Sequence, residues 1–294
     1  MTLSLGTWPS IEEAWWQTTS GLLSMPDGRA VNTVVTVDRP SLEVATSFVE
    51  PIDLMLTSHG RQPIRTVANT LFPSRLYRSP GFTWQPDSDE KTAALDAAAD
   101  KLYGNYLAML PTLMTDRLNA SGTYFSRMIA WPGKEVTGGV NQLAKRIHYL
   151  RAVKGRAHNA SDVTLQSPDD VDALSPLPIQ EYAATDDRQL SFPCLVHVSL
   201  TTLHGRLSMV AVYRHWFVIT RGFGNLVGLS RLLHFLAEQS GYAVGELMIV
   251  ATKGSAERSP YRVEGIKQLL TTTRDLLGAP PVASDANAPE KVPV

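Results

Sequence analysis

The chain of 294 residues contains one cysteine, Cys194, which follows Pro193 at the start of a segment with the pattern of a strand. A cysteine thiolate is a strong nucleophile, so Cys194 is the first candidate for covalent chemistry. A lone cysteine is also a common filler of apolar space, and it cannot form an internal disulfide. No spacing of Cys194 with His and Asp indicates a hydrolase, although such triads are defined by geometry. Both roles of Cys194, nucleophile and filler, stay open at this point.

Three further side chains near Cys194 in the sequence could transfer protons, namely His197, Tyr213 and His215. Imidazole is the side chain that titrates nearest to neutral pH. Alternation along a strand places His197 on the opposite face from Cys194. Each of the three has an equally simple structural role, so we assign none of them to proton transfer.

Short motifs surround Cys194 in a definite order. Along the chain they are Tyr124 with Trp131, Asn141-Gln142-Leu143, Phe192-Pro193-Cys194, Gly205-Arg206-Leu207-Ser208, Arg214, Asn225 and Val244-Gly245-Glu246. Each motif alone is weak, but their shared order and spacing are specific. In both respects the chain resembles the thymidylate synthase family, as a divergent homologue. We take that family to include pyrimidine nucleotide methylases and hydroxymethylases.

The resemblance implies a mechanism and a role for several residues. The Cys194 thiolate would add to C6 of a pyrimidine ring, and C5 would then take a one-carbon unit from 5,10-methylenetetrahydrofolate. Arg214 would bind a phosphate and lower the pKa of the thiol, while Asn225 would bind the pyrimidine amide edge. Tyr124 would be a second catalytic residue that orients a water or a proton. Tyr213 would join Arg214 and Asn225 in binding the substrate.

These residues also have structural alternatives. Arg214 could be a solvated surface arginine, and Asn225 could be the N-cap of a helix that begins at Leu226. Tyr124 could be a core tyrosine with a hydrogen-bonded hydroxyl. Glu246 matches an acidic position that is mainly structural in the family, so we expect a surface or capping role for it.

The chain departs from the family at positions that carry its chemistry. The catalytic glutamate of the family corresponds to Thr70, or to Asn69 if the register shifts by one, and neither can act as that acid or base. Phe217 replaces the aspartate that contacts folate. Ser255-Ala256-Glu257 replaces the His-X-Tyr pair that binds the sugar hydroxyl. The contacts to phosphate, sugar and folate are therefore each reduced, while the cysteine and the asparagine remain.

Three classes of function follow. The first is a one-carbon (methyl or hydroxymethyl) transferase that acts through a cysteine adduct on a pyrimidine-like nucleotide or nucleoside. The second is a non-catalytic protein that binds a nucleotide or a partner on the same fold. The third, which we rank last, is an unrelated cysteine enzyme.

Composition limits the partners. The chain has 27 basic and 28 acidic residues and a formal net charge of −1, so no basic excess indicates a nucleic-acid polymer. No apolar run approaches the ~20 residues of a membrane-spanning helix, and the first residues lack the pattern of a signal peptide. We expect a cytoplasmic protein with a small-molecule substrate, and we assign no metal site.

The hydrophobic pattern predicts an α+β fold. The resemblance narrows this to a thymidylate-synthase-like mixed twisted sheet that is covered by helices and stacks back to back in a homodimer. We expect helices at 10–24, 63–72, 87–110, 141–151 and 226–238, and strands at 30–37, 192–203, 206–212 and 246–251. Segment 42–56 is ambiguous, and 167–190 has the composition of a long surface excursion. We expect one domain over 1–278 and a disordered tail over 279–294.

Overall fold

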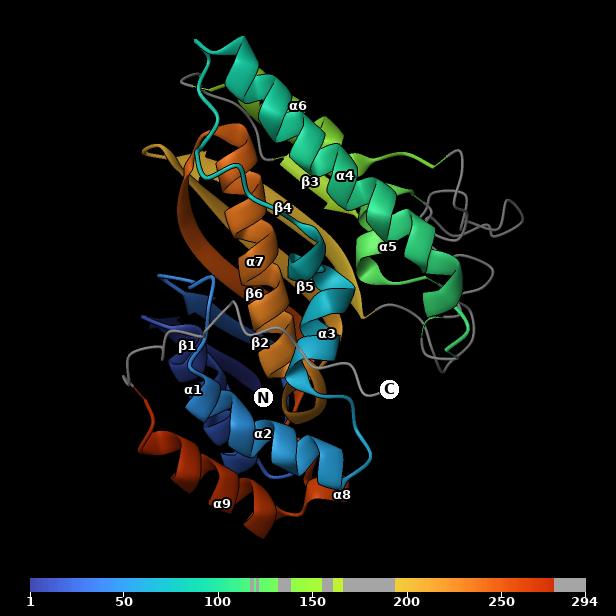
Figure 1. The fold of residues 1–294 in the computed structure, drawn as a ribbon. Helices are drawn as coiled ribbons and strands as arrows, with labels where there is room; N and C mark the ends of the chain where they lie inside the picture. Colours follow the sequence, from blue (N-terminus) through green and yellow to red (C-terminus); the bar gives the residue numbers. More distant parts are fainter. Residues whose placement is uncertain (117–118, 120–121, 132–138, 155–160, 166–193, 278–294) are drawn as a thin grey trace, which may run out of the picture.

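The computed structural model describes residues 1–116, 119, 122–131, 139–154, 161–165 and 194–277 (Figure 1). Within this part of the chain one mixed sheet has the strand order β1-β2-β6-β5-β4-β3. Its strands are β1 (Thr2–Trp8), β2 (Arg29–Val37), β3 (Ser161–Thr164), β4 (Leu195–Leu203), β5 (Arg206–Phe217) and β6 (Ala243–Ser255). The pairs β1–β2 and β5–β6 are parallel and the other neighbours are antiparallel. The prediction of an α+β fold with a mixed sheet is confirmed.

The helices pack on one face of this sheet. They are α1 (Ile11–Ser24), α2 (Thr46–Ser58), α3 (Ile64–Leu71), α4 (Asp89–Leu113), α5 (Tyr124–Ile129), α6 (Gln142–Ala152), α7 (Phe223–Ser240), α8 (Arg258–Tyr261) and α9 (Val263–Arg274). In Figure 1, α7 runs along the sheet with α3 beside it, while α1, α2 and α9 gather at one end and α4, α5 and α6 at the other. A π-helical turn, Val218–Gly222, joins β5 to α7.

The covered face of the sheet is the core side. In β5, Met209, Ala211 and Tyr213 are at most 1% exposed, whereas the alternate residues Val210 and Val212 are half-buried. Strand alternation sends each set to its own face. The second face of the central strands thus carries aliphatic side chains that no described helix covers.

Helices α3 and α7 touch through two glycines one turn apart. A Cβ atom on Gly224 would lie 2.6 Å from Cβ of Val67, and one on Gly228 would lie 2.7 Å from the carbonyl oxygen of Ala68. Only glycine permits so close an approach of one helix to another. This contact fixes the start of α7, and with it Asn225, against α3.

Local sequence signals set several boundaries correctly. The Ser10 hydroxyl accepts a hydrogen bond from the Glu13 amide and so caps α1. The Asn141 side chain caps α6 in the same way through the Ala144 amide, at 2.9 Å. The turn between β4 and β5 has positive φ at both central residues, 50° at His204 and 74° at Gly205. Such a two-residue turn matches the twist of a hairpin, as predicted.

Other expectations were wrong or incomplete. Helix α4 does not break at Pro111 but continues to Leu113, because a proline so near the C-terminus removes only one backbone donor. The ambiguous segment 42–56 overlaps most of α2 (Thr46–Ser58), in which Pro51 masked the helical pattern.

Strands β1 and β3 and helices α5, α8 and α9 were not predicted. Strand β3 and helices α5 and α8 are too short for a periodic signal and depend on packing against the rest of the chain. Helix α9 has a regular apolar face that includes Ile266, Leu269 and Leu270, and this signal was overlooked.

Several predicted features lie outside the described residues. They include the excursion at 167–190, the tail at 279–294 and residues 192–193 of the predicted strand. Within the described ranges, no helix has the length and apolarity needed to cross a membrane.

The two glycines of α7 yield a stability prediction. Gly228→Ala will lower the free energy of unfolding by about 1–3 kcal/mol, because the new methyl group must displace α3. Urea denaturation of the purified protein will measure this change. Gly104→Ala in α4 is the matched control: nothing lies within 4 Å of its Cβ position. It should leave stability unchanged or raise it by about 0.5–1 kcal/mol, since alanine favours a helix. Equal effects of the two substitutions would contradict the close contact.

Candidate functional site

Cys194 lies directly before β4 and is held against β5. Its carbonyl oxygen accepts a hydrogen bond of 2.9 Å from the Arg214 amide, and the His215 backbone N–H donates to its sulfur. The residue is half-buried, so it is not a filler enclosed in the core. The motif residues Cys194 and Arg214 are thus neighbours in space.

A β-bulge follows Cys194. The register of β4 against β5 shifts between Leu195 and His197, so Leu195 and Val198 are both buried although they are three residues apart. An extra residue in one strand interrupts the simple alternation of side chains between the two faces. The imidazole Nε2 of His197 lies 3.3 Å from a carboxylate oxygen of Asp162 in β3. His197 is therefore engaged with the neighbouring strand.

Tyr124 meets the cysteine through the backbone. Its hydroxyl accepts hydrogen bonds from the amides of Cys194, at 3.2 Å, and Leu195, at 3.4 Å. Helix α5 places it there, because Thr123 and Ser126 form a reciprocal cap at the start of that helix. Burial, and then the charge of Cys194, raise the pKa of Tyr124 to about 12. A neutral hydroxyl at this position orients its neighbours and cannot serve as a base at neutral pH.

Two guanidinium groups act on the sulfur, those of Arg214 and Arg221. Each lowers the pKa of the Cys194 thiol, but burial is the larger effect and leaves that pKa above its ordinary value. Arg214 thus lowers the thiol pKa as expected, but in the free protein its effect does not bring that pKa down to its ordinary value. Within the described residues, no carboxylate is among the groups that shift the pKa of Cys194 or of Tyr124.

One buried side chain that acts on Cys194 and Tyr124, that of Tyr213, has a hydroxyl without a hydrogen-bond partner within the described residues. Tyr213 is 1% exposed and its hydroxyl is unpaired; burial raises its pKa well above the usual value, and Tyr124 and Cys194 raise it further. Asn225 is 4% exposed. It lies inside α7, which begins at Phe223, so the alternative that Asn225 is an N-cap is wrong. Buried polar groups normally have partners, so the Tyr213 hydroxyl is a donor or acceptor that a bound molecule could satisfy.

The Glu257 carboxylate holds the turn before α7, a role that the sequence did not predict. The Glu257 carboxylate accepts hydrogen bonds from the amides of Ile219, at 3.0 Å, and Thr220, at 2.9 Å, and also from the Thr220 hydroxyl. Burial raises its pKa, against the effect of these bonds. Glu257, which stands in place of the sugar-binding pair, thus holds the turn that carries Arg221. A single basic residue in the apolar stretch 217–226 was the signal that could have identified Arg221.

The remaining departures from the family have simple local roles. The Thr70 hydroxyl donates to the Val67 carbonyl at 2.7 Å, and Asn69 beside it is half-buried. The Phe217 ring stacks on the His215 ring with centroids 3.9 Å apart. Burial, and then Lys253 and Arg29, lower the pKa of His215. Its imidazole is therefore neutral and belongs to a different environment from the sulfur.

The motif that ends at Ser208 in β5 contacts the motif that ends at Glu246 in β6. The Glu246 amide donates to the Ser208 hydroxyl at 3.1 Å, and the Glu246 side chain is exposed. The contact ties β6 to β5 near the hairpin. The surface role expected for Glu246 agrees with this position.

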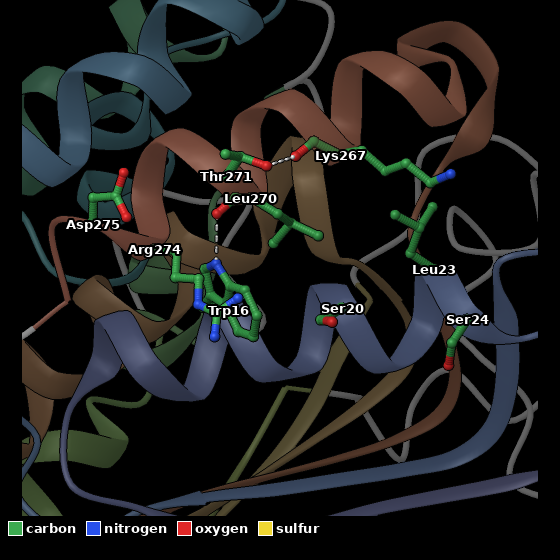
Figure 2. Close-up of a pocket in the computed structure, with 9 residues that line it drawn as sticks. All are labelled: Trp16, Ser20, Leu23, Ser24, Lys267, Leu270, Thr271, Arg274 and Asp275. Carbon is green, nitrogen blue, oxygen red and sulfur yellow. Dashed lines mark hydrogen bonds between the residues drawn. The ribbon is translucent and has the colours of Figure 1, made fainter.

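A separate cavity of about 670 Å³ lies between α1 and α9 (Figure 2). Its lining residues are Trp16, Ser20, Leu23, Ser24, Lys267, Leu270, Thr271, Arg274 and Asp275. The Trp16 indole donates to the Leu270 carbonyl at 2.8 Å, and the Arg274 guanidinium lies 5.9 Å from the centre of the Trp16 ring. None of the residues that the sequence singled out lines this cavity. In the part of the chain that the structure covers, no cluster of three or more His, Cys, Asp or Glu suits a metal ion.

The fold has a counterpart among solved structures. The chain is similar to the thermostable thymidylate synthase A from Bacillus subtilis, with a TM-score of 0.50 and 13% identity over 89% of this chain and 84% of the other. At this identity the likeness shows the fold alone. No protein-family model matches the chain, and no curated protein matches it either.

The environment of Cys194 predicts a pH profile. The rate at which iodoacetamide alkylates this one cysteine will rise with pH through an apparent pKa above that of an ordinary thiol, because burial disfavours the thiolate. Arg214→Gln will move the profile to still higher pH, since it removes the largest effect that opposes burial. The measurement is the second-order alkylation rate by mass spectrometry between neutral and alkaline pH. A profile centred below the ordinary thiol pKa would contradict this account.

Proposed function

We propose that the chain is a thymidylate-synthase-like one-carbon transferase, of methyl or hydroxymethyl type, that forms a cysteine adduct on a pyrimidine-like nucleotide or nucleoside. The observation that carries the proposal is the neighbourhood of Cys194: a half-buried sulfur with Arg214 and Arg221 acting on it and Tyr213 unpaired beside it. The sulfur would add to C6 of the ring and its proton would leave. The electron pair displaced onto C5 would then form a bond to the electrophilic carbon of a one-carbon donor, whose leaving group departs with its bonding pair. Loss of the C5 proton would restore the ring double bond and expel the sulfur from C6.

The roles of the other residues in this proposal follow from their chemistry. The planar guanidinium of Arg214 would donate paired hydrogen bonds to phosphate oxygens. The Asn225 side-chain amide offers both a donor and an acceptor to the edge of the pyrimidine ring. Tyr213 would donate from its unpaired hydroxyl, and Tyr124 would keep Cys194 in position through the backbone. The raised pKa of the thiol implies that the nucleophile forms only when a ligand is bound, since the free protein holds the sulfur protonated.

The one-carbon donor is a separate question. In the thymidylate synthase family it is 5,10-methylenetetrahydrofolate, held in part by an aspartate. Here Phe217 occupies that position with its ring against His215, and a phenyl ring cannot accept the hydrogen bond of a folate ring nitrogen. The residues present therefore do not fit this contact, and we derive no step through folate.

A second candidate is a non-catalytic protein that binds a nucleotide. The raised pKa of Cys194 and the threonine at position 70, in place of an acid, favour it. Both candidates place a pyrimidine over Cys194. They differ in whether a bond to sulfur forms.

A 5-fluoropyrimidine nucleotide distinguishes the two candidates. With 5-fluoro-2′-deoxyuridylate, intact-mass spectrometry of the denatured protein will show an added mass of one nucleotide, and Cys194→Ser will abolish it. A second sample with methylenetetrahydrofolate tests whether the folate adds to the same adduct. Isothermal titration provides the control for binding. Equal nucleotide affinity in both proteins, with no covalent mass in either sample, would contradict catalysis and support the binding protein.

We also propose that two copies stack through the open face of the sheet. That face presents Val210, Val212, Met248 and Val250, all half-buried in the single chain, and the described helices cover the other side (Figure 1). A contiguous apolar patch of this kind is uncommon on a monomer and marks an interface. The resemblance implies the same back-to-back arrangement.

Light scattering tests this interface. The protein will be a dimer at micromolar concentration, and Val250→Lys will make it monomeric, because an ammonium group cannot be buried without a partner. Leu54→Lys is the matched control, since Leu54 is 72% exposed on α2, away from the sheet. It should leave the dimer intact. A monomeric parent protein would contradict the proposed stacking.

A further inference from the structure

The cavity between α1 and α9 is an elongated groove. Its volume of about 670 Å³ falls in the range of small-molecule sites, roughly 300–1,000 Å³. In Figure 2 the two helices run side by side, with Trp16 beside Arg274 at one end and Leu23 beside Lys267 at the other. Both pairs along a helix are seven residues apart (23 − 16 and 274 − 267), which is about two turns or 10 Å. The groove therefore has one cation at each end.

The middle of the groove is apolar. Leu23 and Leu270 point into it in Figure 2, and the Trp16 ring lies on the same side. Leu270 is buried, whereas Leu23 and Trp16 are half-buried, so part of their apolar surface is open to the groove. A half-buried indole beside leucine side chains suits a second flat ring, because aromatic rings gain from offset stacking and from the burial of apolar area.

Three polar hydrogens around the groove are already used within the protein. The Trp16 indole N–H, the Ser24 hydroxyl and the Thr271 hydroxyl donate to backbone carbonyls at 2.8, 2.7 and 3.0 Å. Lys267 and Arg274 differ, because no ion pair joins either of them to a carboxylate within the described residues. Ammonium and guanidinium groups have several donors and no acceptor. A ligand in this groove must therefore supply acceptors, and charged acceptors form the stronger bonds.

The guanidinium of Arg274 is placed close to the apolar part. It lies 5.9 Å from the centre of the Trp16 ring, within the ~6 Å reach of a cation–π contact. A planar fork of donors thus stands beside the surface on which a ring can stack, and such a fork matches the two oxygens of an acidic group. Of the lining residues in the described part of the chain, Asp275 alone carries a carboxylate. Two basic groups against one acidic group favour an anion.

We propose that this groove binds a small aromatic anion, a flat ring that carries an acidic group. The ring packs on Trp16 and Leu270, the acidic group accepts paired hydrogen bonds from Arg274, and Lys267 adds a favourable charge at the far end. The inference goes beyond the proposed function and does not depend on it, because neither Cys194 nor any residue in contact with it lines the groove.

Two dyes that share one aromatic body test the inference. Anilinonaphthalene sulfonate is an anion, phenylnaphthylamine lacks the sulfonate, and both fluoresce more strongly in an apolar site. Arg274→Gln should weaken binding of the sulfonate by about threefold or more, as expected for the loss of one nearby charge in a solvated groove. Binding of the neutral dye should not change. Asp275→Asn should strengthen binding of the sulfonate by a similar factor, a gain that damage to the fold would not produce.

Lys101→Gln is the matched control, since Lys101 is an exposed basic residue on α4, at the other end of the sheet (Figure 1). It should leave the affinity for both dyes unchanged. In the parent protein, naphthoate should displace the bound sulfonate, because it has both a ring and an acidic group. Acetate at the same concentration has the charge without the ring and should not displace it.

Four results would overturn the inference. They are an affinity for the sulfonate that Arg274→Gln does not lower, an equal loss for the neutral dye, an equal loss in Lys101→Gln, and displacement by acetate as well as by naphthoate. Light scattering of Leu23→Lys adds a fifth: a change of oligomeric state would assign the groove to a contact between two copies of the chain. None of these outcomes bears on the fluoropyrimidine adduct, so the two proposals stand or fall separately.

Discussion

The contact between α3 and α7 at Gly224 and Gly228 is the constraint on which the rest of the site depends. Helix α7 lies along the middle of the sheet, and its buried leucines form much of the core. Because two glycine positions bring α3 against its backbone, the helix cannot slide or rotate without a steric clash. The first turn of α7 therefore has one position, and Asn225 is held there with almost no exposed surface.

A second constraint acts on the chain just before that helix. The Glu257 carboxylate satisfies two backbone donors that a helix start leaves without partners. Since Glu257 follows β6, this interaction closes the end of the sheet onto the start of α7. It also determines where Arg221 lies. The contacts around Cys194 come from the starts of β4 and α5 and the end of β5.

The sequence predicted the main elements where local signals were strong. The helices expected to begin near Ser10 and Asn141 and the break between the strands at His204-Gly205 lie within about one residue of the observed boundaries. Motif spacing also brought Cys194, Tyr124 and Arg214 together as expected. What could not be predicted depends on distant contacts. The contact of His197 with Asp162 depends on the neighbouring strand β3, burial outweighed the effect of Arg214 on the thiol pKa, and the role of Glu257 required knowledge of where β6 ends.

The protonated state of Cys194 has a consequence for the lifetime of the protein. Peroxides attack the thiolate and not the thiol, so a sulfur kept protonated by burial is oxidised slowly to the sulfenic and sulfinic acids. The same burial that raises the thiol pKa would therefore slow the oxidation of this sulfur. The chain has only one cysteine, so an oxidised Cys194 cannot form an internal disulfide. Reductants could otherwise return such a disulfide to two thiols. By disfavouring ionisation of the Cys194 thiol in the free protein, burial limits its oxidation.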